Sequence, residues 1–195
     1  MLYRLPLFAA MAFALGGCVI SSPEMLLEAT EAVAPLPDRF TMHPYAERDD
    51  GYRLSSDSPI TYTRTGADYV AGDNSVTLRF AELGGDTYLV AVHGGEANTL
   101  YGTVDLHGDV LLINMVLDEI APEALRDLPP EIGGDVLSEE GGIIVSSRAA
   151  LDHVIAQLRS GTLVTSPLVA WITTDPAATP PARIVNDADG WHPAD

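Results

Sequence analysis

A run of alternating sequence between residues 76 and 117 limits the possible folds more than any other part of the chain. Four segments in which apolar and polar residues alternate follow one another, and a glycine-containing pair separates each segment from the next. Glycine supplies the positive φ angles that tight hairpin turns require. The pattern predicts an antiparallel β-meander of four strands, over residues 76–83, 86–93, 99–106 and 109–117.

The pairing of these strands predicts which residues share a face, because opposed residues of a hairpin point to the same side. In the predicted register of the three hairpins, Phe80 lies opposite Val90, Val90 lies opposite Gly102, and Val104 lies opposite Leu111. One face is then apolar and the other polar, as expected of a sheet with one solvated side. The apolar face holds Val76, Leu78, Phe80, Tyr88, Val90, Val92, Leu100, Val104, Leu106, Leu111, Ile113 and Met115, and the polar face holds Thr77, Arg79, Thr87, His93, Thr99, Tyr101, Thr103, Asp105 and Asn114.

Length and charge narrow the classes of function. The chain has 195 residues, of which 47% are hydrophobic, so it is long enough for one domain with a single core and flanking tails. Its 28 acidic residues outnumber 10 basic ones, giving a formal net charge of -18. A protein with this much negative charge repels nucleic-acid phosphates. We therefore expect no nucleic-acid partner.

The first 18 residues have the proportions of a bacterial export signal. Residues 1–4 carry one positive charge, and residues 5–14 form an apolar stretch too short to span a bilayer. Leu15-Gly16-Gly17-Cys18 follows, and Cys18 is the only cysteine of the chain. This segment resembles the leader of the bacterial lipoprotein class, whose lipobox is a leucine, two small residues and a cysteine that becomes lipidated.

The resemblance covers the leader and not the mature domain. It implies that residues 1–17 are a cleaved signal peptide and that Cys18 carries acyl chains such as palmitate. Two or three chains, at about 0.8 kcal/mol per buried CH₂, would anchor the protein firmly to a membrane. Such lipoproteins often keep an aspartate after the cysteine when they stay in the inner membrane. Position 19 is valine, which favours the outer membrane, facing the periplasm.

The rest of the chain divides by composition. We expect residues 18–39 to be the lipidated N-terminus and a tether, residues 40–174 a folded domain, and residues 175–195 a flexible proline-rich tail. Proline and acidic residues predict a short helix over residues 118–128.

The strongest helix signal covers residues 147–160. A serine can cap its start, Gly161 can end it, and an apolar stripe recurs at helical spacing. We expect this stripe to cover the apolar face of the meander, where Gly102 would leave room for close approach. The stripe consists of Leu151, Val154, Ile155 and Leu158.

The sequence carries no recognisable catalytic, cofactor-binding or metal-binding motif. His93 and His107 fall at opposite ends of one predicted strand, roughly 20 Å apart at ~3.3 Å per residue, so they cannot share a metal ion. The His93-Gly94-Gly95 run lacks the G-x-S-x-G nucleophile that an esterase needs. If catalysis exists, the most plausible assembly joins His93, Glu96 and a serine from another loop. The only site residue that we assign is therefore Cys18, as the lipidation site.

These observations predict an α+β fold in which an antiparallel β-meander is covered by one main helix. A small lipocalin-like β-barrel is the alternative, because a continuous meander can curl and close. The favoured function is a non-enzymatic, membrane-anchored envelope module that binds another envelope protein or has a structural role. A carrier of small apolar ligands in the periplasm is the alternative, and a hydrolase ranks third.

Overall fold

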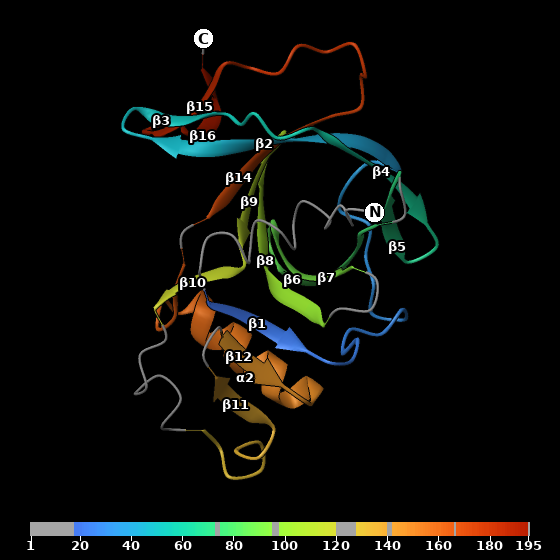
Figure 1. The fold of residues 1–195 in the computed structure, drawn as a ribbon, viewed down its shortest axis with the longest axis vertical. Coiled ribbons are helices and arrows are strands. Elements are labelled where there is room, and N and C mark those ends of the chain that lie inside the picture. The colour runs from blue at the N-terminus through green and yellow to red at the C-terminus, as the bar shows by residue number, and fades with distance from the viewer. Residues whose placement is uncertain are drawn as a thin grey trace, which may run out of the picture.

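The computed structural model describes residues 18–72, 75–94, 98–119, 128–139, 142–165 and 167–194. Strands dominate this described part of the chain, and one helix within it, α2 (Arg148–Arg159), lies beside them (Figure 1). The strands are β1 (Cys18–Ser22), β2 (Arg39–Arg48), β3 (Gly51–Leu54), β4 (Ile60–Thr65), β5 (Asp68–Ala71), β6 (Thr77–Gly84), β7 (Thr87–His93), β8 (Thr99–His107), β9 (Val110–Asn114), β10 (Val116–Glu119), β11 (Val136–Glu139), β12 (Gly142–Val145), β13 (Val164–Thr165), β14 (Leu168–Thr173), β15 (Arg183–Asp187) and β16 (Gly190–Ala194).

The meander closes into an eight-stranded antiparallel β-barrel. The ring runs β2-β4-β5-β6-β7-β8-β9-β14, and β14 pairs back with β2 through Val169↔Tyr45 to Thr173↔Thr41. Closure leaves none of these eight strands as a free edge along the ring. The lipocalin-like barrel, which was the alternative, therefore describes the fold better than an open sheet covered by a helix.

The predicted apolar face of the meander points into the barrel. Buried aliphatic and aromatic side chains from all eight strands form this interior core, together with Leu36, Val76 and Met115, which lie outside the strand bounds. An eight-stranded barrel has an interior just wide enough for side chains to fill. The buried core residues are Leu36, Phe40, Met42, Tyr62, Tyr69, Ala71, Val76, Leu78, Phe80, Val90, Val92, Val104, Leu111, Ile113, Met115, Ala170 and Ile172.

Two of the three predicted hairpin registers are confirmed, and the third is wrong by two residues. Val90 pairs with Gly102 and Phe80 pairs with Val90, as predicted. Val104, however, pairs with Ile113 and not with Leu111. A slip of two residues preserves the face of every side chain. The prediction of inward and outward faces therefore held although the turn was placed wrongly.

Helix α2 matches its predicted span, with Ser147 as N-cap and Ser160 as C-cap. The predicted docking of its stripe is wrong. Leu151, Val154, Ile155 and Leu158 pack outside the barrel in a second core, which we call the side layer. Because the closed barrel covers its own apolar face, that face is not available to the helix. The side layer joins α2 to β1, β11 and β12, which lie beside one another in Figure 1. It also contains the outer side chains Ala81, Leu89, Ala91 and Tyr101.

Two glycines allow backbones to approach closely. A Cβ at Gly102 would lie 2.5 Å from Cγ of Met115, so this glycine makes room for the end of β9 and not for the helix. Gly142 has φ +152°, and a Cβ there would overlap the backbone of Val19, its partner in the parallel pairing of β1 with β12.

The predicted flexible tail forms part of the structure. Residues 183–194 make the β15–β16 hairpin, in which Gly190, at φ +90°, begins β16 directly after the turn, and β15 pairs with β3. This hairpin covers a third core that contains Tyr45, Ile184 and Trp191. The Tyr45 hydroxyl donates to the Pro181 carbonyl at 2.5 Å. The prolines of this region led to the prediction of a flexible tail, although short alternating strands lie on either side of the turn.

The predicted tether also differs from the structure. Strand β1 pairs with β8 through Ile20↔Tyr101 to Ser22↔Thr99, so the chain joins the sheet at Cys18. Residues 23–36, which we call the strap, then run along the outside of the barrel to the start of β2. Most of the predicted helix at 118–128 lies outside the described residues, and residues 118–119 belong to β10. Within the described ranges, no helix has the length and hydropathy needed to cross a membrane.

Candidate functional site

The barrel interior is the first candidate site, and every residue that lines its cavity is apolar. A cavity of about 20 Å³ remains at its centre. Its lining includes two methionines, Met42 and Met115, whose flexible thioether side chains adapt readily to irregular volumes. The other lining residues are Leu36, Phe40, Leu78, Phe80, Val90, Val92, Val104, Leu111 and Ile113.

Aromatic rings bound the cavity on the side of β2, β4 and β5. Phe40 stacks on Tyr62 with ring centroids 5.4 Å apart, and Tyr69 meets Phe80 edge-on at 5.7 Å. The Tyr69 hydroxyl donates to the Leu36 carbonyl at 2.6 Å and accepts from the Leu36 amide at 3.2 Å. Burial raises the pKa of Tyr69. Tyr69 therefore remains a neutral hydrogen-bonding group that fixes the end of the strap.

The weakest seam of the barrel wall lies between β5 and β6. Among the described residues these strands pair through Tyr69↔Leu78 and Val70↔Thr77, and the Ala71 amide donates to the Val76 carbonyl at 2.9 Å. Every other pair in the ring has at least four partner positions. The strap fills the remaining gap. The Val33 amide donates to the Phe80 carbonyl at 2.9 Å, and the side chains of Val33 and Leu36 pack into the interior core. Part of the barrel wall is thus a segment that is not a barrel strand.

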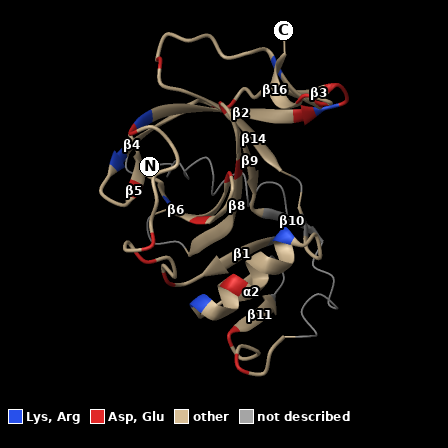
Figure 2. Ribbon diagram, turned by 180° about the vertical axis from the view of Figure 1, so that it is seen from behind, with Lys and Arg blue, Asp and Glu red and all other residues tan. Residues whose placement is uncertain are grey.

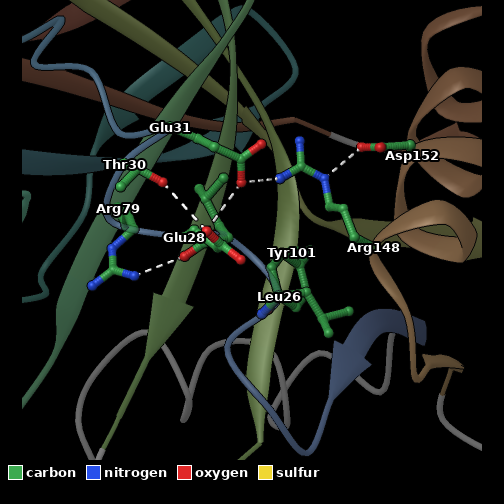
Figure 3. Close-up of polar contacts among 9 residues, drawn as sticks. Leu26, Glu28, Thr30, Glu31, Arg79, Tyr101, Arg148 and Asp152 are labelled. Atoms are coloured by element: carbon green, nitrogen blue, oxygen red, sulfur yellow. Dashed lines mark hydrogen bonds and ion pairs between the residues drawn. The ribbon is translucent and has the colours of Figure 1, made fainter.

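Three side chains, Tyr101, Arg79 and Arg148, hold the strap from outside (Figure 3). The Tyr101 hydroxyl accepts from the Leu26 amide at 2.6 Å, and burial raises the pKa of Tyr101. Arg79 donates to the Leu27 carbonyl at 2.7 Å and to both carboxylate oxygens of Asp68, at 2.7 and 3.0 Å.

Arg148 connects the strap to the helix. Its guanidinium bridges Glu31 at 2.6 Å and Asp152 at 2.8 Å. Partial burial acts to lower the pKa of Arg148, but the hydrogen bond that Arg148 donates to Asp152 and the charges of Asp152 and Glu31 raise it. The strap is therefore fixed at its middle by charged groups and at its end by Tyr69.

The histidines do not converge. His93 lies 3.2 Å from the Thr99 hydroxyl through Nδ1, and His107 is exposed at the far end of β8. His153 contacts Gln157 on α2, His43 packs against Trp171, and His192 contacts Asp187. Among the described residues no three histidine, cysteine, aspartate or glutamate side chains gather around a point that could hold a metal ion. Glu96, the proposed partner of His93, lies outside the described residues.

Sequence reasoning missed the strap and its role in the wall. Its signal was weak, because Val33 and Leu36 are separated by Ala34 and Pro35 and show no strand alternation. Tyr101 was placed on the polar face, where it does lie, but its hydroxyl is used inside the protein and not in solvent.

Comparison with known proteins gives no further guidance. No protein-family model, curated protein or solved structure matches the chain. The barrel, the strap and the side layer are therefore the basis for inferring what the protein does.

Proposed function

We propose that this protein is a lipid-anchored binding module of the cell envelope, and that its barrel takes up a small apolar ligand. The observation that carries the proposal is the all-apolar interior cavity, whose wall is completed by the strap residue Leu36. An apolar lining without polar partners disfavours polar or charged ligands, because burying an unpaired polar group costs roughly 1–3 kcal/mol.

The ligand enters where the strap fills the β5–β6 seam. The resting cavity of about 20 Å³ is too small for an organic molecule. Withdrawal of Val33 and Leu36 from the core would add the volume of two aliphatic side chains and open the wall at its weakest pairing. Met42 and Met115 would then adjust to the shape of the ligand.

The proposed anchor is the acylated Cys18, in the outer membrane and facing the periplasm. Since β1 begins at Cys18, no free linker would separate the acyl chains from the barrel. The domain would therefore lie close to the bilayer, where apolar molecules concentrate. In this proposal the protein binds without catalysis, and a further envelope protein would receive or deliver the ligand.

A neutral fluorescent probe, N-phenyl-1-naphthylamine, tests ligand uptake. Leu36→Ala enlarges the cavity, so it should increase the affinity for the probe, by about tenfold for a gain near 1.4 kcal/mol. Val90→Phe fills the cavity centre and should weaken binding by a similar factor. Leu137→Ala, at a side chain that is 54% exposed, is the control. Probe affinity that is equal in all three variants would refute uptake into the barrel.

Lipidation is tested separately. Cys18→Ser should abolish labelling by a fatty-acid analogue and release the protein from membranes, or leave it with an uncleaved leader. Unchanged labelling in this variant would show that another residue is modified.

A further inference from the structure

A second cavity lies outside the barrel, between its polar wall and the C-terminal end of helix α2. It has a volume of about 500 Å³, within the range typical of small-molecule sites. Strands β7, β8 and β9 contribute one side through Thr87, Thr103, Asp105 and Asn114. Helix α2 and the chain after it contribute the other side. We call this cavity the outer cleft.

The barrel side of the outer cleft is a connected hydrogen-bond network. The Thr87 hydroxyl donates to Oδ1 of Asp105 at 2.6 Å, and Nδ2 of Asn114 donates to Oδ2 of Asp105 at 3.2 Å. The second Nδ2 proton of Asn114 points to the Thr103 hydroxyl at 3.4 Å, and Oδ1 of Asn114 accepts from Thr165 at 3.1 Å. Thr87↔Asp105 and Thr103↔Asn114 are cross-strand partners, so the sheet itself fixes these positions.

The barrel side of the outer cleft has hydrogen-bond acceptors that the network leaves unused. Asn114 uses both amide protons, and Thr87 and Thr165 have donated theirs. An ionised carboxylate offers about four lone-pair sites, and the contacts above use two of those on Asp105. What remains is acceptor capacity on Asp105, Thr87 and Thr165, with one hydroxyl proton on Thr103. A ligand group that matches this wall is a strong donor with a positive charge, such as an ammonium.

The helix side contributes the opposite charge. Arg159 lines the outer cleft from the last turn of α2. Its side chain forms no ion pair with any other residue that the structure describes. An unpaired guanidinium is a ready partner for a carboxylate. Leu158 and Leu163 supply the apolar part of the lining, and none of the described residues that line the cleft has an aromatic ring to stack on a sugar or a base.

We infer that the outer cleft binds a small zwitterion, with its ammonium on Asp105 and its carboxylate on Arg159. A free dipeptide has this chemistry and suits the volume. This site is independent of the apolar interior, because the side chains of the network point outward from the barrel wall. The protein would thus hold two ligands of opposite polarity on the two faces of the same strands.

Isothermal titration with alanyl-alanine tests the inference, using N-acetyl-alanyl-alanine and alanyl-alanine amide as analogues that each lack one charge. Loss of one charge-assisted hydrogen bond should weaken binding by about tenfold or more. With the native protein, we therefore expect each analogue to bind about tenfold or more weakly than alanyl-alanine. Asp105→Asn and Arg159→Gln should each cost the zwitterion a similar factor. Asp105→Asn should also weaken the binding of alanyl-alanine amide, which keeps the ammonium. Arg159→Gln should weaken the binding of N-acetyl-alanyl-alanine, which keeps the carboxylate.

Matched controls are Asp86→Asn in the neighbouring hairpin turn and Arg48→Gln on an exposed strand end, which should leave affinity unchanged. Arg159 is exposed, so its variant remains informative even if Asp105→Asn destabilises the fold. The inference is overturned if alanyl-alanine does not bind saturably, if either analogue binds equally well, or if the control variants lose as much affinity as the cleft variants. Binding of N-phenyl-1-naphthylamine should not change in Asp105→Asn, which separates this site from the interior.

Discussion

The barrel interior and the side layer are both apolar cores, but the chain builds them in different ways. The barrel uses strands β4 to β9, which follow one another in sequence and pair with their neighbours. The side layer gathers β1, β11, β12 and α2 from opposite ends of the chain, and β1 pairs in parallel with β12 (Figure 1). Six of the eight strands around the first core thus pair locally, and only its closure by β14 and β2 joins distant segments. In the second core, β1 meets β12 and the helix only after distant segments have come together.

Charged residues also contribute to the connection between the two cores. Figure 2 shows acidic residues on turns and strand ends, and fewer basic residues. Arg79 and Arg148 both contact the strap, which crosses from the side layer to the barrel. In a chain with a net charge of -18, arginines at such junctions neutralise carboxylates that would otherwise repel one another. The link between the two cores is therefore electrostatic as well as apolar.

The largest effect should come from placing a carboxylate in each core. Val90 is 2% exposed in the barrel, and Val154 is fully buried in the side layer. A buried unpaired charge costs about 3–5 kcal/mol, a large part of a typical stability of 5–15 kcal/mol. We expect Val90→Asp to unfold the whole protein and Val154→Asp to detach the side layer while the barrel remains folded.

Amide hydrogen exchange distinguishes these outcomes, because protection reports local opening. In Val154→Asp, the amides of β6 and β7 should stay protected while those of β12 and α2 exchange. Leu137→Asp, on exposed β11, is the control and should cost little. Loss of protection throughout the barrel in Val154→Asp would mean that the two cores fold as one unit.

The contrast between the cores explains what the sequence could predict. Alternation identified the strands of the meander and the faces of Phe80, Val90 and Val104, because those are local properties. It could not show that the apolar face closes on itself, since closure depends on the pairing of β14 with β2 across more than a hundred residues. The helix was predicted from its caps and stripe, but its partners in β1, β11 and β12 are distant in sequence and carry no shared pattern.

The candidate sites, too, were predictable only where they depend on local sequence pattern. Thr87, Thr103, Asp105 and Asn114 were predicted to share the polar face, and they do. Their role in a cleft depends on Arg159 and Thr165, which reach them only because α2 packs outside the barrel. The strap was taken for a tether because its two anchoring side chains, Val33 and Leu36, lack strand or helix spacing.

An intermediate effect is expected at the junction that joins β1 to β12. Gly142 has φ +152°, and a side chain there would overlap the backbone of Val19. Strain of about 1–3 kcal/mol from the backbone angle, together with loss of close pairing, should make Gly142→Ala destabilise the side layer. Chemical denaturation measures the loss. Gly134→Ala, which faces open space, should be nearly neutral, and equal midpoints for the two variants would contradict the close approach of β1 and β12.

The smallest effect concerns two histidines near the third core, where the C-terminal hairpin covers the barrel. Burial lowers the pKa of His43 from its ordinary value of 6.5. The pKa of His192 is raised, first by the Pro193 carbonyl near Nδ1 and then by Asp187 near Nε2. Titration of the ring protons by NMR should therefore place His43 below His192, and the reverse order would contradict the burial of His43 against Trp171.

The opposite shifts give opposite dependences of stability on pH. As the pH falls below about 6.5, the unfolded chain binds a proton at His43 before the folded protein does, so the free energy of unfolding decreases. His192 behaves in the reverse way: its contribution is fully present below the unfolded pKa and is lost as the pH rises through the raised folded pKa. His43→Gln should therefore reduce the acid-side fall in melting temperature, whereas His192→Gln should lower the melting temperature at acidic pH and leave it unchanged at alkaline pH. If neither variant alters the pH profile, the third core gains no stability from the protonation state of either ring.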